Sequence, residues 1–355
     1  MPPWNKRRLI LVWRRGRSVL ENERVGFLAN VMVVPNLIEP VTSHAKKPRF
    51  RQWITALLFA VSLLIGGALL LPYWMPTAIV YAPNFGTRPN ISRRVSSAQL
   101  RALGISQQME VQVGPPAARL SVWMMEPARQ PARGTVLVLH GIRDSKSSML
   151  GMGHLLADGG YRSVLVDLRG HGLSSGDWLT YGVVDSEDLT QVLDAIDAQN
   201  FLTEPVGVFG CSYGAATAIQ LAARDPRVQS VVAVAPFSTL HVAVHSYARL
   251  LGLGFFLPRR LIDQAVEEAG QIGHFQPSEA SPLRAIQQTN ARILLIHGTA
   301  DWKIPASSSQ QLHAAALHHS RLILVEKAGH DSVMATVQSK AAAEILAWFD
   351  RPSVE

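Results

Sequence analysis

Cysteine is almost absent from this chain of 355 residues, which contains only Cys211. A single thiol cannot form an internal disulfide, so the fold must be stabilised by its hydrophobic core. The sequence also lacks the HExxH and CxxC spacings that commonly hold metal ions. We therefore predict no disulfide framework, no metal site and no cofactor.

Excess positive charge is missing from most of the chain. Residues 1–52 contain 11 Lys and Arg and three acidic residues, a net charge of +8, whereas residues 53–355 contain 23 of each sign. Proteins that bind nucleic acid generally present a basic surface to the phosphates. A neutral main domain excludes that class, so we predict no nucleic-acid partner.

Charged residues are also absent from Gln52 to Thr87. Within this window, residues 53–76 read WITALLFAVSLLIGGALLLPYWMP, and about 20 apolar residues suffice to cross a bilayer as a helix. Trp53 at one end and Tyr73 and Trp74 at the other occupy positions typical of interfacial aromatic residues. The pattern predicts an uncleaved transmembrane helix. The alternatives are a buried core helix, which would carry a polar face, and a cleaved signal peptide, which would be shorter.

Basic residues flank the predicted span on both sides: Lys46, Lys47, Arg49 and Arg51 precede it, and Arg88, Arg93 and Arg94 follow it. The small excess before the span is extended by a basic cluster at residues 6–24. By the positive-inside rule, this predicts a cytoplasmic N-terminus and a catalytic domain on the outer, periplasmic or extracellular side. Residues 1–52 show no regular pattern, and we expect a disordered tail or an extension before a true start at Met32.

From residue 109 onwards, apolar runs alternate with helical stretches. MEVQV and LSVWMM, joined by a Gly-Pro-Pro turn, predict an antiparallel hairpin. Continuous apolar runs typical of strands buried on both faces then follow. They are TVLVLHG (135–141), RSVLVD (162–167), VGVFG (206–210), VQSVVAVAP (228–236), ARILLIHG (291–298) and RLILVE (321–326). This alternation predicts an α/β fold with a mostly parallel sheet, helices on both faces, and a site at the carboxyl ends of the strands.

The domain limits follow from this pattern. Residues 77–108 are predicted to be a linker with a short helix, and residues 109–350 the catalytic domain. An insertion at about 237–290 predicts a small helical cap over the carboxyl ends of the strands, although an ordinary crossover with extra helices is an alternative. One final helix is expected over 332–349, and Asp331 is expected to cap it.

The segment VGVFGCSYGAATAIQLAA (206–223) predicts a strand, a tight turn and a helix. The turn contains G-x-S-x-G, typical of a nucleophile elbow, in which Gly210 and Gly214 are small because the backbone packs closely there. Ser212 holds the central position and is the predicted nucleophile. Cys211 is predicted to be a small buried apolar residue.

A serine hydroxyl needs a general base, and in this arrangement the acid and the histidine follow the nucleophile in the chain. Asp301 is the only carboxylate between Glu279 and Glu326, and it follows a predicted strand. Of the later histidines, only His330 lies in a loop at the carboxyl end of a strand. The predicted catalytic triad is therefore Ser212, Asp301 and His330.

An oxyanion hole requires two backbone N–H groups directed at the developing charge. We predict that Tyr213, after the nucleophile, supplies one, and that Ile142 in the loop LHGIRDS supplies the other, with Arg143 as the second choice. His140 is expected to brace this loop, and His171 is expected to be structural.

Five motifs in this order resemble the alpha/beta hydrolase superfamily over residues 109–350: LHG (139–141), DLRGHGLSSG (167–176), GCSYG (210–214), HGTAD (297–301) and AGHD (328–331). Within it, the sequence is most similar to bacterial serine hydrolases of the monoacylglycerol lipase-like and S33 or S9 peptidase-like groups. The resemblance implies a Ser-Asp-His triad. The basic tail and the predicted anchor depart from the pattern, and a shared fold does not identify the substrate.

Three functions are compatible with these residues. The first is a membrane-anchored serine hydrolase of small-molecule or lipid-like carboxylic esters, for which the apolar run LLGLGFFLP in the predicted cap would suit an acyl chain. The second is a serine peptidase or amidase, for which only the pair Glu267 and Glu268 could hold a substrate amino terminus. The third, a non-catalytic membrane scaffold, is disfavoured by the intact triad. We predict the first, and the oligomeric state stays open.

Overall fold

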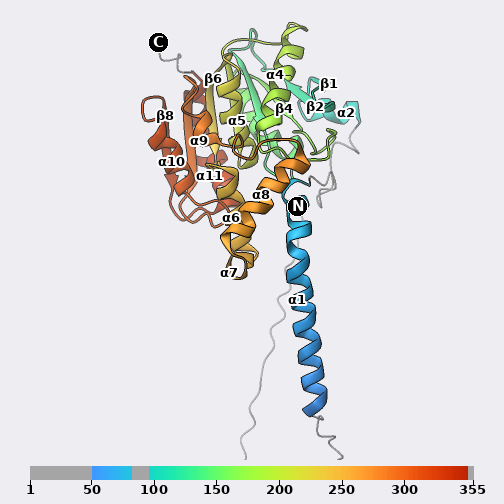
Figure 1. Cartoon of the computed structure of the whole chain (residues 1–355). Helices are drawn as coiled ribbons and strands as arrows, with labels where there is room; N and C mark the ends of the chain where they lie inside the picture. Colours follow the sequence, from blue (N-terminus) through green and yellow to red (C-terminus); the bar gives the residue numbers. More distant parts are fainter. Residues whose placement is uncertain (1–49, 82–95, 351–355) are drawn as a thin grey trace, which may run out of the picture. The chain divides into compact units, whose positions relative to one another are not determined.

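The computed structural model describes residues 50–81 and 96–350, and an eight-stranded sheet forms its centre (Figure 1). The strands are β1 (Gln107–Val113), β2 (Ala118–Met125), β3 (Thr135–Leu139), β4 (Arg162–Val166), β5 (Val206–Cys211), β6 (Val228–Val234), β7 (Arg292–Gly298) and β8 (Ser320–Val325). They lie in the order β1-β2-β4-β3-β5-β6-β7-β8, and only β2 runs against the others. The predicted α/β fold and its opening antiparallel hairpin are confirmed.

Helices cover both faces of this sheet. One face carries α4 (Val183–Asp197), α5 (Tyr213–Arg224), α9 (Pro282–Ala285) and α10 (Ser307–Ala315). The other carries α2 (Ser97–Ala102), the 3₁₀ helix η2 (Lys146–Met149), α3 (Leu150–Asp158), α11 (His330–Lys340) and α12 (Ala342–Asp350). Because alternate strand residues point to opposite faces, Leu137 joins the first core cluster and Val138 the second.

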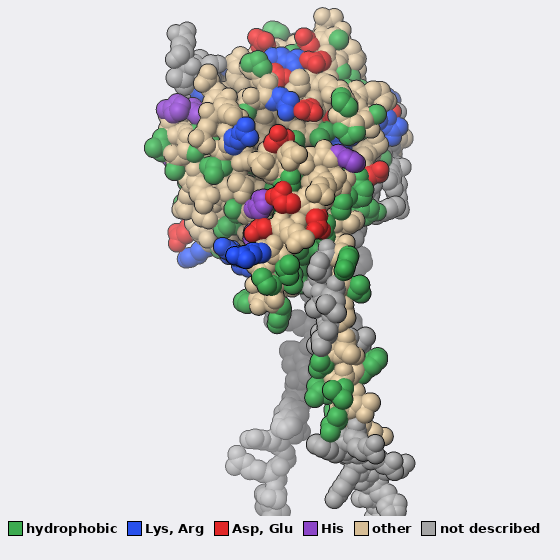
Figure 2. Space-filling view, viewed as in Figure 1, with side chains coloured by type: hydrophobic (Ala, Val, Ile, Leu, Met, Phe, Trp, Pro, Cys, Tyr) green, Lys and Arg blue, Asp and Glu red, His purple; other side chains and the backbone are tan. Residues whose placement is uncertain are grey.

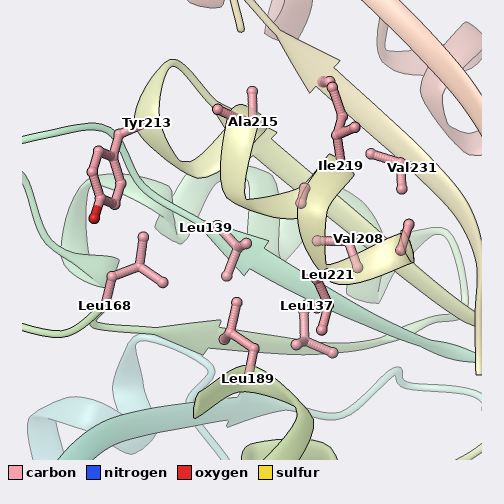
Figure 3. Packing of buried hydrophobic residues seen from close by; sticks show 14 of the residues in the cluster. Leu137, Leu139, Leu168, Leu189, Val208, Tyr213, Ala215, Ile219, Leu221 and Val231 are labelled. Atoms are coloured by element: carbon pink, nitrogen blue, oxygen red, sulfur yellow. The ribbon is translucent and has the colours of Figure 1, made fainter. Parts of the chain in front are cut away.

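The core beneath α4 and α5 holds the central strands in place. Figure 3 shows Leu137 of β3 beside Leu189 of α4, and Val231 of β6 beside Ile219 of α5, and all four are fully buried. Each such aliphatic side chain stabilises the fold by about 1.5–3 kcal/mol relative to an exposed one. Since α5 is buried from its first turn onwards, its start is held firmly against the sheet.

The helix α1 (Phe50–Val80) contains the segment that the sequence predicts to span a membrane. Within the ranges 50–81 and 96–350, no helix combines the length and the hydropathy that crossing a bilayer requires. The anchor over 53–76 stays a prediction. The end of α1 packs with the sheet domain, since Val80 is fully buried and its carbonyl accepts the Leu179 N–H at 2.6 Å.

The chain divides into two compact units, Met1–Leu57 and Leu58–Glu355. Only residues 50–57 of the first unit are described. The predictions made for the tail at residues 1–49, and for the part of the linker at residues 82–95, lie outside the described residues. In the linker, α2 provides the expected short helix.

The predicted cap insertion contains α6 (Leu240–Leu250), α7 (Leu253–Phe256) and α8 (Arg259–Gly273), followed by α9 on the face of the sheet. Thr239 caps α6 by accepting a hydrogen bond from the Val242 N–H. Since α8 is strongly amphipathic, its apolar residues Ile262 and Ala265 turn inward and pack with Ala248 of α6.

Two predictions about the end of the chain were wrong. The final helix is divided at Ala341 into α11 and α12, although no Gly or Pro marks the break. After the break, Trp348 and Phe349 of α12 pack into the second core cluster. Asp331 does not cap α11. Ser332 Oγ instead accepts from the N-cap Gly329 N–H, and Asp331 pairs with a lysine, described below.

A buried ion pair joins the loops that follow β3 and β4. Lys146 Nζ lies 2.5 Å from Asp167 Oδ2, and both side chains are fully buried. Asp167 also accepts the backbone N–H groups of Lys146 and Leu173. Burial lowers the pKa of Lys146, and the Asp167 carboxylate opposes that shift. The two loops are therefore tied together at the edge of the sheet where the strands end.

We expect the substitution Lys146→Met to lower the free energy of unfolding by about 3–5 kcal/mol, because it leaves the Asp167 carboxylate buried without a cation. Urea unfolding followed by circular dichroism would measure this. The matched control is Arg119→Met, since Arg119 pairs with Glu110 at 3.4 Å with both side chains about half exposed. That control should lose less than about 1 kcal/mol, and equal losses in both variants would contradict the prediction.

Candidate active site

Ser212 lies in the turn between β5 and α5 with a backbone conformation that residues other than glycine rarely adopt. Its φ is 51° and its ψ is −112°. Such strain costs on the order of 1–3 kcal/mol and persists only where the surrounding structure imposes it. The Ser212 N–H is held by the Val234 carbonyl at 2.7 Å, which fixes the turn against the end of the neighbouring strand.

Glycine is required on both sides of this turn. A Cβ atom at Gly210 would overlap the Gly214 carbonyl, and one at Gly214 would lie only 2.6 Å from the His140 carbonyl oxygen. A larger residue at either position would push α5 away from β3 and β5. The G-x-S-x-G pattern therefore has a direct steric explanation in the structure.

The structure brings together the three residues that the sequence predicted as a triad. His330 Nε2 lies 2.9 Å from Ser212 Oγ, and His330 Nδ1 lies 2.6 Å from Asp301 Oδ2. Asp301 follows β7, and His330 begins α11 just after β8. These distances allow the Ser212 hydroxyl to donate to one ring nitrogen while the other nitrogen donates to the carboxylate.

The Asp301 carboxylate is buried and hydrogen-bonded on both oxygens. Its Oδ1 accepts the backbone N–H groups of Lys303 and Ile304, both at 2.9 Å. Burial alone would raise the pKa of Asp301, but hydrogen bonds from His297, His330 and the Ile304 N–H outweigh it and hold the pKa well below its usual range. Asp301 is therefore ionised at neutral pH.

His297 is a site residue to which the sequence analysis assigned no role. It is the penultimate residue of β7 and is fully buried, and its Nε2 lies 3.3 Å from Asp301 Oδ2. Its ring is held by Ser309 Oγ at 2.7 Å and by the Ile304 carbonyl at 3.1 Å. The sequence signal was the HGTAD motif itself, in which a histidine ends an otherwise apolar strand four residues before the acid.

Asp331 does not contact the other acidic residue of the site. Its carboxylate pairs with Lys303 Nζ at 2.7 and 2.9 Å and is largely exposed. The two neighbouring carboxylates therefore differ in environment, since Asp301 is buried and holds the histidine whereas Asp331 forms a surface ion pair.

The two predicted oxyanion donors lie on either side of Ser212. Tyr213 is the first residue of α5, so its N–H has no acceptor within the helix. The loop carrying Ile142 comes close as well, because a Cβ atom on Gly141 would lie 3.7 Å from the Ser212 Cβ. Among the hydrogen bonds of the described residues, none uses the N–H of Ile142 or Tyr213. Their role as oxyanion donors stays a prediction.

Side-chain hydrogen bonds hold these donors in position. The Tyr213 hydroxyl donates to Asp185 Oδ2 at 2.8 Å and accepts the Tyr181 N–H at 3.0 Å. His140 is fully buried; it donates to the Gly141 carbonyl and accepts the Leu168 N–H. It braces the loop, as predicted.

His171 is buried as well, and it takes no part in the Ser212 hydrogen bonds. Its Nδ1 donates to the Arg169 carbonyl at 2.9 Å, and its ring packs edge-on against His140. The structural role predicted for His171 agrees with these contacts.

Cys211 lies next to the serine but in a different environment. It packs against the second core cluster at the end of β5, and burial raises the pKa of its thiol to about 12. Because only the thiolate is a strong nucleophile, Cys211 is chemically unsuited to attack at neutral pH.

We expect the Cys211 thiol to be almost unreactive toward Ellman's reagent in the folded protein at pH 8, where a pKa near 12 leaves a thiolate fraction on the order of 10⁻⁴. The same thiol should react stoichiometrically in urea. As a control, Leu317→Cys would add a thiol at a position that is 67% exposed, which should react within seconds to minutes. Rapid native labelling of Cys211 would contradict the prediction.

Comparison with known proteins gives a consistent class. Residues 130–275 match a family model described as serine aminopeptidase, S33, a region that runs from β3 to α8 and includes Ser212. YqkD of Bacillus subtilis (strain 168), an uncharacterised protein, is 26% identical over 208 residues, 55% of this chain and 64% of that one. This chain thus spans just under two thirds of that relative. Rv2307c of Mycobacterium tuberculosis (strain H37Rv), also uncharacterised, is 27% identical over 280 residues, 76% and 86% of the two chains.

Solved structures with low sequence identity share the fold. An esterase of Pyrococcus furiosus has a TM-score of 0.58 at 21% identity, covering 73% of this chain and 96% of that one. A membrane phospholipase A, titled a bacterial virulence factor, has a TM-score of 0.51 at 20% identity, covering 83% and 98%. An acylaminoacyl peptidase has a TM-score of 0.52 at 18% identity, covering 70% and 41%.

The sheet topology and the solved structures give the chain the alpha/beta hydrolase fold. Residues 130–275, which include the strained serine turn, are similar to the serine aminopeptidase family, S33.

Proposed function

We propose that the chain is a serine hydrolase that cleaves carboxylic esters, with Ser212 as nucleophile, His330 as general base and Asp301 as the residue that orients the base. The hydrogen-bond chain from Ser212 Oγ through His330 to Asp301 Oδ2, at 2.9 and 2.6 Å, carries this proposal. It gives a strained and partly exposed hydroxyl a proton acceptor, which a serine needs in order to attack a carbonyl carbon.

Acylation uses each of these groups in turn. His330 Nε2 takes the proton of Ser212 as its Oγ bonds to the ester carbon, and the carbonyl oxygen becomes an alkoxide. The N–H groups of Tyr213 and Ile142 stabilise that negative charge. The ionised Asp301 stabilises the imidazolium, which then gives its proton to the leaving alkoxide as the C–O bond breaks and an acyl ester remains on Ser212.

Deacylation repeats the sequence with water. His330 accepts a proton from water as its oxygen attacks the acyl ester, and returns that proton to Ser212 Oγ as the carboxylic acid leaves. Both half-reactions use only side chains, backbone N–H groups and water, so this chemistry needs no cofactor.

Several observations support a lipid-like ester. Two structural neighbours are an esterase and a membrane phospholipase A, and the fold is shared over 98% of the length of the second. In this chain, α6 approaches the triad. Burial raises the pKa of the Tyr247 phenol on α6, and the nearby Asp301 charge raises it further. We propose that residues 53–76 anchor the chain with the catalytic domain on the outer side of the membrane.

A peptidase or amidase is the second candidate, because the matching family is described as an aminopeptidase. An aminopeptidase needs carboxylates free to hold the substrate amino group. Glu267 lies 3.4 Å from His241 and lines a surface hollow of about 740 Å³ that contains none of the three triad residues. Glu268 accepts a hydrogen bond from Gln264. These contacts commit both carboxylates elsewhere and favour the ester.

We expect the full chain to hydrolyse nitrophenyl esters and to prefer medium or long acyl chains over short ones, with much slower cleavage of aminoacyl anilides. A fluorophosphonate probe should label the wild type and Cys211→Ala but not Ser212→Ala. Faster cleavage of the anilides would replace the esterase proposal by the peptidase. Labelling that survives in Ser212→Ala and vanishes in Cys211→Ala would reverse the assignment of the nucleophile.

We expect Asp301→Asn to lower kcat by about 10⁴ with little change in the fold. A neutral amide neither holds His330 in the tautomer with its proton on Nδ1 nor stabilises the imidazolium by charge. The matched control is Asp331→Asn, which removes only an exposed ion pair with Lys303 and should keep kcat within about threefold. Steady-state kinetics on the best nitrophenyl ester would measure both. Near-normal turnover in Asp301→Asn would exclude it from the triad.

A further inference from the structure

The connection between α6 and α8 exposes several large apolar side chains. Leu251, Phe255 and Phe256 are 69%, 83% and 85% exposed, and no residue of α7 is buried. Figure 2 shows hydrophobic side chains gathered at the α7 end of the molecule. We call Leu251, Phe255 and Phe256 the α7 tip. Two adjacent, almost fully exposed phenylalanines do not contribute to the core. Exposing their rings to water is unfavourable, so their position needs an explanation other than packing.

Local backbone geometry directs this tip away from the core. Gly252 has a φ of 76°, a left-handed conformation that ends α6 and turns the chain outward. Pro258 precedes α8 and returns the chain to the cap. The tip is therefore a protruding turn carried on two packed helices, and its convex form does not provide a groove for a peptide or a small ligand.

Three arginines surround the apolar tip. Arg249 lies in the last turn of α6, Arg259 and Arg260 begin α8, and all three are exposed. No acidic residue lies between Asp225 and Asp263 in the sequence. Asp263 is engaged by His245 at 2.7 Å, and within the described ranges none of the three guanidinium groups forms an ion pair or a hydrogen bond. The rim of the tip is thus positively charged and uncompensated.

The base of the tip is continuous with the end of α1. Met75 is buried against Ala248 of α6 and against Ile262 and Ala265 of α8. Met75 also lies at the end of the segment proposed as the membrane anchor. The two helices that carry the tip are therefore held next to the point where that anchor would leave the bilayer.

We propose that the α7 tip and its three arginines dock on the surface of a lipid bilayer that contains anionic headgroups. Aromatic and aliphatic side chains enter the boundary between headgroups and acyl chains, and arginines beside them bind lipid phosphates. The inference rests on the proposed anchor, which brings the cap to the bilayer. Docking gives the anchored domain a second contact with the bilayer. It turns α6, which carries Tyr247 near Asp301, toward the lipid layer from which a lipid ester would enter.

A fluorescence experiment on the full chain tests the docking directly. In a Cys211→Ala background, an environment-sensitive label on Phe256→Cys is reconstituted into vesicles of phosphatidylcholine and phosphatidylglycerol with brominated acyl chains. We expect the brominated lipids to quench the label by about twofold or more and to shield it from aqueous iodide. The same label on Leu317→Cys, in the turn that precedes β8, should be quenched by iodide and not by bromine.

Three outcomes would overturn the docking. The first is iodide quenching of the Phe256→Cys label without bromine quenching. The second is energy transfer between labels on two copies of the chain without bromine quenching, which would make a second copy the occupant of the tip. The third is equal bromine quenching in vesicles of phosphatidylcholine alone and in anionic vesicles, which would remove the role of the arginines.

An activity test separates this inference from the proposed function. In the full chain, Phe255→Ser with Phe256→Ser should leave kcat/KM for a soluble nitrophenyl ester unchanged and lower hydrolysis of a vesicle-borne ester by about tenfold. Arg259→Gln with Arg260→Gln should lower it in anionic vesicles only. Unchanged vesicle hydrolysis in both variants would contradict the docking. If the wild type cleaves neither ester, the esterase proposal fails while the bromine quenching still decides the docking.

Discussion

The close approach of two backbone segments at Gly210 and Gly214 is the constraint on which the rest of the site depends. Because neither residue has a Cβ atom, α5 can start directly above the end of β5 and against the His140 carbonyl. That contact leaves Ser212 with a strained positive φ of 51°, and its hydroxyl lies within hydrogen-bond distance of His330. The strain is supported by an α5 that is buried over almost its whole length.

Every other part of the site is held relative to that turn. The loops that follow β3, β4, β7 and β8 all leave the sheet at the same edge, because parallel strands bring their carboxyl ends together. Polar contacts then fix the loops individually. Lys146 and Asp167 join the first two, and Asp301 joins the last two through His330. Charges that would be costly to bury alone thus serve as ties between loops.

The cap differs from the sheet in what stabilises it. Its inner residues, such as Ile262, pack as in any core, whereas its outer end exposes aromatic side chains beside unpaired arginines. A surface of this kind is unfavourable in water and favourable at an anionic interface. The same segment therefore offers a physical link between a general hydrolase site and a substrate delivered from a lipid layer.

The sequence by itself determined the strands, the parallel sheet and the identity of the serine turn. These features depend on local properties, namely continuous apolar runs and the steric need for glycine on both sides of Ser212. Only the tertiary structure decided which side chains meet across the sheet edge. It added His297 beside Asp301, paired Asp331 with Lys303, buried Lys146 against Asp167 and divided the final helix. The two lysine–aspartate pairs join residues 28 and 21 positions apart in the chain. Packing and the desolvation of charges select such contacts, and no local pattern of the sequence records them.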